Sequence, residues 1–159
     1  ESELEKAPRQ VVVNNNLAVA YSDRGDDACA AERLEVALAE RPGYWRAWVN
    51  LGIARRHLGE RGRARAAFQR AIDIAPGETA PLLHQALFLE DEGDSDGAAA
   101  RLARARALQP EDAGLARTHG EVLLRAGRRE EARAALEEAL RLDPHDAESR
   151  RLLGGLGPR

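Results

Sequence analysis

Four sets of small residues recur along this chain at a constant spacing of 34 residues. Glycines fall at Gly25, Gly59, Gly93 and Gly127, and prolines at Pro42, Pro76, Pro110 and Pro144. Alanines keep the same spacing in two further sets, which are Ala30, Ala64, Ala98 and Ala132, and Ala37, Ala71, Ala105 and Ala139. A fixed period of this length is the signature of a repeat protein, in which each unit buries its apolar side against its neighbours. The period therefore predicts a short array of stacked units.

The period divides the 159 residues into four complete units and a partial fifth. The units span 11–44, 45–78, 79–112 and 113–146. The polar residues 1–10 are expected to form a frayed N-terminal lead-in, and residues 147–159 a C-terminal capping helix and tail. Alanine, arginine, leucine and glutamate dominate, which favours helix. Each unit is expected to be two antiparallel helices, at about positions 1–14 and 15–28 of the unit.

Large and small residues alternate in a characteristic order in the second unit. Counted from its first residue, it has Trp48 at position 4, Leu51 at 7, Gly52 at 8, Ala64 at 20, Phe68 at 24, Ala71 at 27 and Pro76 at 32. This order resembles the tetratricopeptide repeat family, whose signature is W-x2-L-G-x2-Y, then A-x3-F, then P. The resemblance implies an all-α, right-handed α-solenoid of antiparallel helix pairs. Departures from the signature are Arg55 at the usual tyrosine, and Gln85 and His119 at the usual leucine.

Glycine at position 8 needs a reason, because a glycine inside a helix costs about 1 kcal/mol relative to alanine. This position holds only small residues, which are Ala18, Gly52, Ala86 and Gly120. We expect them to let the two helices of a unit approach closely, with the large residue at position 24 filling the space beside them. Glycine at position 15 suits a tight turn, and proline at position 32 ends the second helix.

The resemblance also implies a concave inner surface, which such arrays use for binding. Helix geometry places positions 2, 5, 6, 9, 12 and 13 on the side of the first helix that faces away from the core. Several of these positions are apolar although core packing does not require it: Val19, Val49, Ile53, Leu83 and Leu87. They either form the floor of a groove for an apolar anchor, or are buried against the neighbouring first helix by tight curvature of the array.

Position 6 holds Asn16, Asn50, His84 and Thr118. An amide both donates and accepts hydrogen bonds, so it can pair with a peptide backbone without selecting side chains. A similar asparagine ladder lines the arrays of O-linked N-acetylglucosamine transferases, although asparagine is also a plain consensus residue here. The predicted peptide-binding groove comprises Asn15, Asn16, Val19, Arg46, Val49, Asn50, Ile53, His57, Leu83, His84, Leu87, Arg117 and Glu121.

The family also contains a carboxylate clamp that holds the C-terminus of chaperones. The clamp needs basic and asparagine residues at positions 5 and 9 of one unit, 6 of the next, and 2 and 6 of the third. Counted from unit one, this chain supplies Asn15, Val19, Asn50, Ala80 and His84, of which only Asn50 fits, and from unit two none fits. The sequence therefore argues against a co-chaperone that binds the C-terminal tail of chaperones. Because arginines and carboxylates lie on the same face, it favours a ligand of mixed charge.

No pattern of catalytic or cofactor-binding residues is found. A net charge of −3 does not suit a general nucleic-acid binder, and no apolar run approaches the ~20 residues of a membrane span. The four histidines are far apart in sequence, and a groove-facing pair, His57 with His84, would lack a third metal ligand. Cys29 is the only cysteine and is expected to be a small packed residue. We expect no enzyme activity, cofactor or metal.

Three functional hypotheses follow. The first is a protein-interaction scaffold that holds a peptide or partner segment in the groove. The second is a substrate-recruiting or regulatory domain excised from a larger enzyme. The third is a repeat protein that self-assembles into a homo-oligomer. The sequence leaves the partner and the compartment open.

Overall fold

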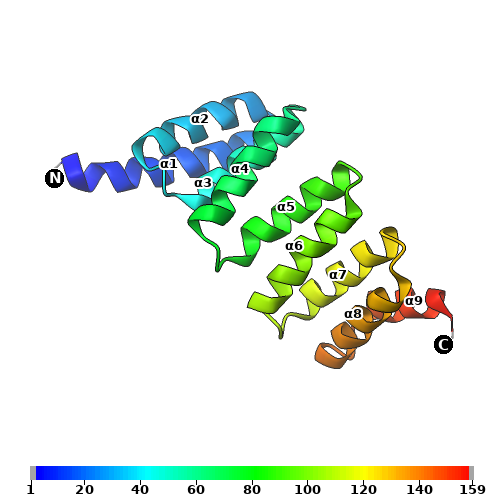
Figure 1. Cartoon of the computed structure of the whole chain (residues 1–159). Helices are drawn as coiled ribbons and strands as arrows, with labels where there is room; N and C mark the ends of the chain where they lie inside the picture. The colour runs from blue at the N-terminus through cyan, green and yellow to red at the C-terminus, as the bar shows by residue number, and fades with distance from the viewer. Residues whose placement is uncertain (1–2, 158–159) are drawn as a thin grey trace. The chain divides into compact units, whose positions relative to one another are not determined.

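The computed structural model describes residues 3–157, which form α-helices joined by short turns, with no strand among them (Figure 1). The helices are α1 (Glu3–Asp23), α2 (Asp27–Glu40), α3 (Trp45–His57), α4 (Arg61–Ile74), α5 (Thr79–Asp91), α6 (Ser95–Leu108), α7 (Ala113–Arg125), α8 (Arg129–Leu142) and α9 (Ala147–Leu156). The odd-numbered helices from α3 onward begin at Trp45, Thr79, Ala113 and Ala147, each 34 residues after the last. None of the helices in the described part of the chain is long and apolar enough to cross a bilayer.

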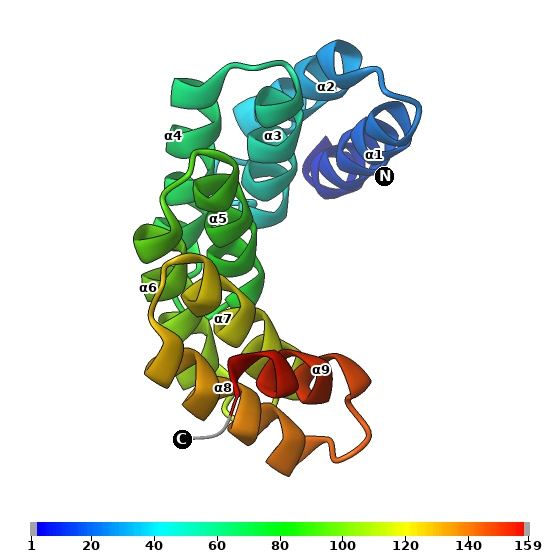
Figure 2. The same cartoon turned by 90° about the vertical axis from the view of Figure 1, so that its right-hand side faces the viewer.

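The helices pair in chain order. α1 packs on α2, α3 on α4, α5 on α6 and α7 on α8, and α9 covers α8 (Figure 2). The chain divides into two compact units, with the boundary between Pro76 and Gly77. The first unit contains α1 to α4 and the second contains α5 to α9. Each unit thus has two complete helical hairpins, and the second has an additional helix at its end.

Glycine makes the turn inside each hairpin. Gly25, Gly59, Gly93 and Gly127 all have φ between 74° and 79°, the left-handed region that glycine enters without steric cost. At the α3–α4 turn the Gly59 amide donates to the Arg56 carbonyl at 3.0 Å, and the Glu60 amide donates to the Arg55 carbonyl at 2.9 Å. These bonds satisfy the last carbonyls of α3, as in other glycine-terminated helices.

Proline separates each hairpin from the next. The second helix of each pair ends two residues before Pro42, Pro76, Pro110 or Pro144. The residue before each proline has ψ between 67° and 95°, outside the helical region. Proline hinders a helical conformation at the residue that precedes it, which explains why these helices stop here.

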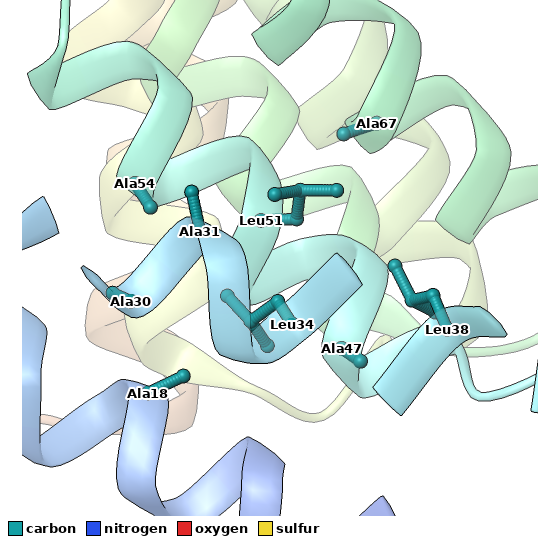
Figure 3. Close-up of a cluster of buried hydrophobic side chains, with 9 residues drawn as sticks. All are labelled: Ala18, Ala30, Ala31, Leu34, Leu38, Ala47, Leu51, Ala54 and Ala67. Atoms are coloured by element: carbon teal, nitrogen blue, oxygen red, sulfur yellow. The ribbon is translucent and has the colours of Figure 1, made fainter. Parts of the chain in front are cut away.

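A cluster of nine buried apolar side chains fills the centre of the first unit (Figure 3). Six of them are alanines and three are leucines, so the backbones of α1, α2 and α3 can approach closely. Four of the nine come from α2, namely Ala30, Ala31, Leu34 and Leu38, which places α2 at the middle of the core. Tyr21, Tyr44 and Trp48 pack against this cluster and are only partly buried.

The structure explains the glycine at position 8. A Cβ atom added to Gly52 would lie 2.6 Å from Cε1 of Phe68, whose ring is fully buried. The equivalent Gly120 would place a Cβ 2.7 Å from Cγ of Leu136. Both contacts are shorter than carbon atoms tolerate, so in the second and fourth repeats the residue at position 24 excludes a side chain at position 8, whereas the first and third repeats have alanine there.

The two ends of the array differ from each other. α1 begins at Glu3, so the described part of the expected polar lead-in belongs to the first helix. The N-terminal part of α1 extends past the end of α2 (Figure 1). At the other end, α9 packs on α8 and buries Ser149. The helix therefore covers α8.

Candidate functional site

A small pocket opens between α1, α2 and α3 in the first unit. Its volume is ≈ 130 Å³, similar to the ~150 Å³ cavity that can hold a benzene ring. We call it the α1–α3 pocket, and its lining residues are Ala18, Val19, Ser22, Asp23, Ala30, Leu34, Asn50 and Ile53. Most of the lining is apolar, with three polar side chains among it. The pocket is therefore of a size and character to take one apolar side chain.

Three residues of the predicted groove meet in this pocket. Val19 comes from α1, and Asn50 and Ile53 come from α3. Val19 is 42% exposed although it is apolar, and Ile53 is partly buried. These two side chains and the small residues of α2 form an apolar surface that ends at the Asn50 amide.

Two other predicted groove residues are buried, and the expectation that they line an open groove is wrong. Val49 is 5% exposed and Asn15 is 7% exposed. The Nδ2 of Asn50 donates to the Oδ1 of Asn15 at 2.9 Å, so the first helices of the first two repeats contact each other directly at this position. Curvature therefore buries position 5 in this part of the array, which is the alternative that the sequence left open.

The Asn50 amide is partly occupied by this internal bond. The neighbouring Asn15 also donates to the Oδ1 of Asn16, at 3.5 Å. Two residues of the predicted asparagine ladder, Asn16 and Asn50, are thus both bonded to Asn15, and the Asn50 bond links α3 to α1. Asn50 also borders the α1–α3 pocket.

Two acidic residues, Asp23 at the end of α1 and Asp27 at the start of α2, lie at or near the pocket. Asp23 lines it, and Asp27 lies at the start of α2 and accepts a hydrogen bond from the Ser22 hydroxyl at 2.5 Å. The Nδ1 of His57 lies 3.1 Å from the Oδ1 of Asp27, so this predicted groove residue ties α3 to α2. Arg46 instead stacks on the ring of Trp45, with its guanidinium carbon 4.4 Å from the ring centroid.

The remaining predicted residues belong to the second unit. Leu83, His84 and Leu87 lie on α5, and Leu87 is 42% exposed. Arg117 and Glu121 lie on α7, and the Nε of Arg117 is 3.7 Å from the Oε1 of Glu121.

Arg117 also donates to the Oδ1 of Asp146 at 3.1 Å. Asp146 is buried and caps α9, where it accepts bonds from the backbone and hydroxyl of Ser149. Burial opposes ionisation of Asp146, but these hydrogen bonds and Arg117 outweigh it and lower the pKa of the carboxyl below its ordinary value. Arg117 thus connects α7 to α9.

Comparison with known proteins identifies the family. One family model of the tetratricopeptide repeat matches residues 15–79, and a second model of the same repeat matches residues 89–156. The chain belongs to the tetratricopeptide repeat family. Proteins of this family typically mediate protein–protein interactions and are generally not enzymes.

Two curated relatives match parts of this tetratricopeptide repeat chain. Heat-shock protein cognate (HSC) co-chaperone sgt12 of Aspergillus fumigatus is 36% identical over 67 residues, which are 42% of this chain and 20% of the relative. Cellulose synthase operon protein C of Xanthomonas axonopodis pv. citri is 30% identical over 103 residues, 61% of this chain and 7% of the relative. The chain thus spans a fifth or less of the length of these relatives.

Solved structures of tetratricopeptide repeat proteins share the fold. MamA from Desulfovibrio magneticus RS-1 superposes with a TM-score of 0.77 at 20% identity, over 92% of this chain and 83% of that one. PilF of Pseudomonas aeruginosa gives a TM-score of 0.77 at 20% identity, over 97% of this chain and 79% of that one. TTC0263, a protein of Thermus thermophilus, gives a TM-score of 0.73 at 24% identity, over 96% of this chain and 84% of that one. The predicted fold class, an all-α solenoid of antiparallel helix pairs, is confirmed.

The tetratricopeptide units show no cluster of three or more metal-ligating side chains among the described residues. A hydrogen bond with Asp26, together with burial and nearby acidic charge, raises the pKa of the Cys29 thiol, which reduces the fraction of reactive thiolate. The ring of His119 accepts from the Arg106 guanidinium at 3.2 Å. Burial and the positive charges of Arg106 and Arg128 lower its pKa to about 4, so this histidine is neutral at pH 7.

The sequence-based site omitted several residues of the α1–α3 pocket. Ser22 and Asp23 occupy positions 12 and 13 of the first repeat. Their spacing alone places them on the side of the first helix that faces away from the core, so they could have been included. Ala30 and Leu34 come from the second helix of the first repeat and were expected only to fill the core. Whether these two residues reach the pocket depends on the distance between α1 and α3, which the repeat pattern does not specify.

Proposed function

We propose that this chain is a protein-interaction module that holds an apolar side chain of a partner segment in the α1–α3 pocket. The observation that supports the proposal most is the meeting of Val19, Ile53 and Asn50 around one opening. Val19 keeps 42% of its surface exposed at a place where solvent would favour a polar residue. The two apolar side chains would contact the anchor, and Asn50 would bond the adjacent peptide group.

The charges near the pocket narrow the choice of partner. Asp23 lies in its wall and Asp27 lies nearby on α2. A free C-terminal carboxylate or an acidic flank would be repelled here, whereas a neutral or basic flank would be favoured. One curated relative is a co-chaperone by name. In this chain only Asn50 fits the chaperone-binding clamp, so we propose an internal apolar anchor as the ligand.

A peptide selection tests the proposal. Peptides are selected from a random library on the immobilised chain, and the affinity of the best binder is measured for Val19→Asp and for Ile53→Asp. Each substitution places a carboxylate in the apolar pocket and is expected to weaken binding at least tenfold. Val36→Asp is the control, because Val36 is an exposed valine of α2 that does not line the pocket. Selected peptides that bind all three variants equally would refute the proposal.

A recruiting domain within a longer protein is the second candidate. Both curated relatives are several times longer than the segment that they share with this chain. In such a protein the α1–α3 pocket would serve the same purpose of holding a partner or substrate segment. The surrounding reading frame tests this candidate, and a frame that encodes only these repeats would remove it.

A further inference from the structure

A second pocket, unrelated to the α1–α3 pocket, lies over α2, α3 and α4. Its volume is ≈ 690 Å³, within the range of ~300–1,000 Å³ that is usual for ligand sites. We call it the α4 pocket. Its apolar lining comprises Trp48, Leu51, Ala66 and Ala67, and its charged lining comprises Glu35, Arg55, Arg63 and Arg70.

The two pockets use opposite sides of α3. Successive residues of a helix are turned by about 100°, so Leu51 and Arg55 project roughly opposite to Asn50 and Ile53. A ligand in the α4 pocket would therefore not compete with one in the α1–α3 pocket for the same surface of α3. Trp48 is held in place because its indole Nε1 donates to the Pro42 carbonyl at 2.7 Å. Its ring is only partly buried and provides a fixed apolar wall.

The charges at this pocket are unevenly compensated. Arg55 replaces the tyrosine of the repeat signature and pairs with both Glu35 of α2 and Glu60 of the α3–α4 turn. Arg63 has a side chain that is 70% exposed and shares Glu60, at 3.2 Å. Arg70 is exposed and forms no ion pair within the described part of the chain. Arg70 therefore adds a positive charge without an ion pair beside Ala66 and Ala67, and Arg63 shares its carboxylate with Arg55.

This local excess contrasts with the charge of the whole chain. Residues 45–74 contain seven arginines and two acidic residues, whereas the complete sequence has a net charge of −3. Arg63 and Arg70 are two turns apart on one side of α4, so they stand at either end of the alanines in the pocket. The site therefore presents an apolar centre between two guanidinium groups, each of which can bind a carboxylate with two hydrogen bonds.

We infer that the α4 pocket binds an acidic segment of a partner protein, with an aliphatic or aromatic side chain on Trp48 and Ala66 and carboxylates on Arg63 and Arg70. The apolar lining favours a peptide, because a nucleic-acid backbone would leave it uncovered. This surface is additional to the proposed peptide site. Together the two sites would recognise segments of opposite charge.

Two capped peptides test the inference by NMR. One has a central leucine pair between glutamates, and the other has lysines in place of the glutamates. The indole N–H signal of Trp48, assigned with Trp48→Phe, reports on the pocket, and the indole of Trp45 serves as the internal reference. The glutamate peptide is expected to shift the Trp48 signal saturably, to bind at least tenfold more tightly than the lysine peptide, and to bind more weakly at high salt.

Matched substitutions locate the binding. Arg70→Glu and Ala66→Glu are expected to weaken the glutamate peptide at least tenfold, and both residues are exposed, so the fold should persist. Arg104→Glu is the control, because Arg104 is the equivalent exposed arginine of the next repeat, and it is expected to change affinity less than twofold. The inference is overturned by the absence of a saturable Trp48 shift, by equal binding of both peptides, or by equal loss in Arg104→Glu. A single-stranded oligonucleotide that shifts Trp48 at lower concentration than the glutamate peptide would also overturn it.

Discussion

Three glycines of the second repeat have different surroundings, and their replacement by alanine should have three different effects. Gly52→Ala forces a Cβ against the buried Phe68 ring and should cost about 1–3 kcal/mol of unfolding free energy. Gly59 has open space around it but φ of +74°, so Gly59→Ala should cost about 1–2 kcal/mol from the backbone alone. Gly62 lies in α4 with neither constraint, and Gly62→Ala should stabilise by about 0.5–1 kcal/mol. Urea unfolding measures all three, and equal losses would contradict this account.

His119 should make the stability of the second unit depend on pH. Its pKa is about 4 in the folded chain, below the ordinary 6.5, so between these values the unfolded chain binds a proton that the folded chain does not. Stability from this group is therefore present above pH 6.5 and falls as the pH drops towards 4. His119→Leu restores the usual residue of the repeat and should reduce the loss between pH 7 and pH 5 by about 1 kcal/mol, less than the full ~1.4 kcal/mol per unit because the ring is partly exposed. Parallel pH profiles of the two proteins would disprove this role.

At the scale of elements, α9 should depend on one carboxylate. Asp146 caps the helix, bonds Ser149 and holds Arg117 of α7. Asp146→Ala should cost about 1–2 kcal/mol and selectively increase amide exchange in α9. Asp143→Ala, at an exposed neighbouring aspartate, is the control. Because the pKa of Asp146 is lowered, its contribution is present above the ordinary pKa near 3.8 and is lost as the pH falls through the lower folded value. Unchanged exchange in α9 of Asp146→Ala would show that the cap is dispensable.

The helical hairpins could be predicted from the sequence, but the complete binding surface could not. Gly52 and Phe68 contact each other within one hairpin, so their spacing and their sizes together determine the contact. The exposure of Val49 depends on how successive first helices approach each other, which a repeat of 34 residues does not define. The α4 pocket was missed for a related reason. Trp48 occupies a core position of the signature but is only partly buried, and Arg55, which lines the same pocket, departs from that signature.

At the scale of the whole molecule, the division into two compact units should be visible in how the chain unfolds. Stability in repeat proteins is approximately a sum of local terms, so damage in one place need not spread evenly. Phe68 and Leu136 occupy the same position in the second and fourth repeats, and both are fully buried. Phe68→Ala and Leu136→Ala should each remove about 2–5 kcal/mol of local stability.

Hydrogen exchange measured along the chain distinguishes local from global damage. In Phe68→Ala the amides of α1 to α4 should lose more protection than those of α7 to α9, because the cavity lies in the first unit. Leu136→Ala should give the opposite pattern, so each variant is the control for the other. If both variants lost protection equally over all described helices, the chain would unfold as one cooperative body. Occupancy of a pocket in the first unit would then also protect α5 to α9, whereas local unfolding would confine that protection to the first unit.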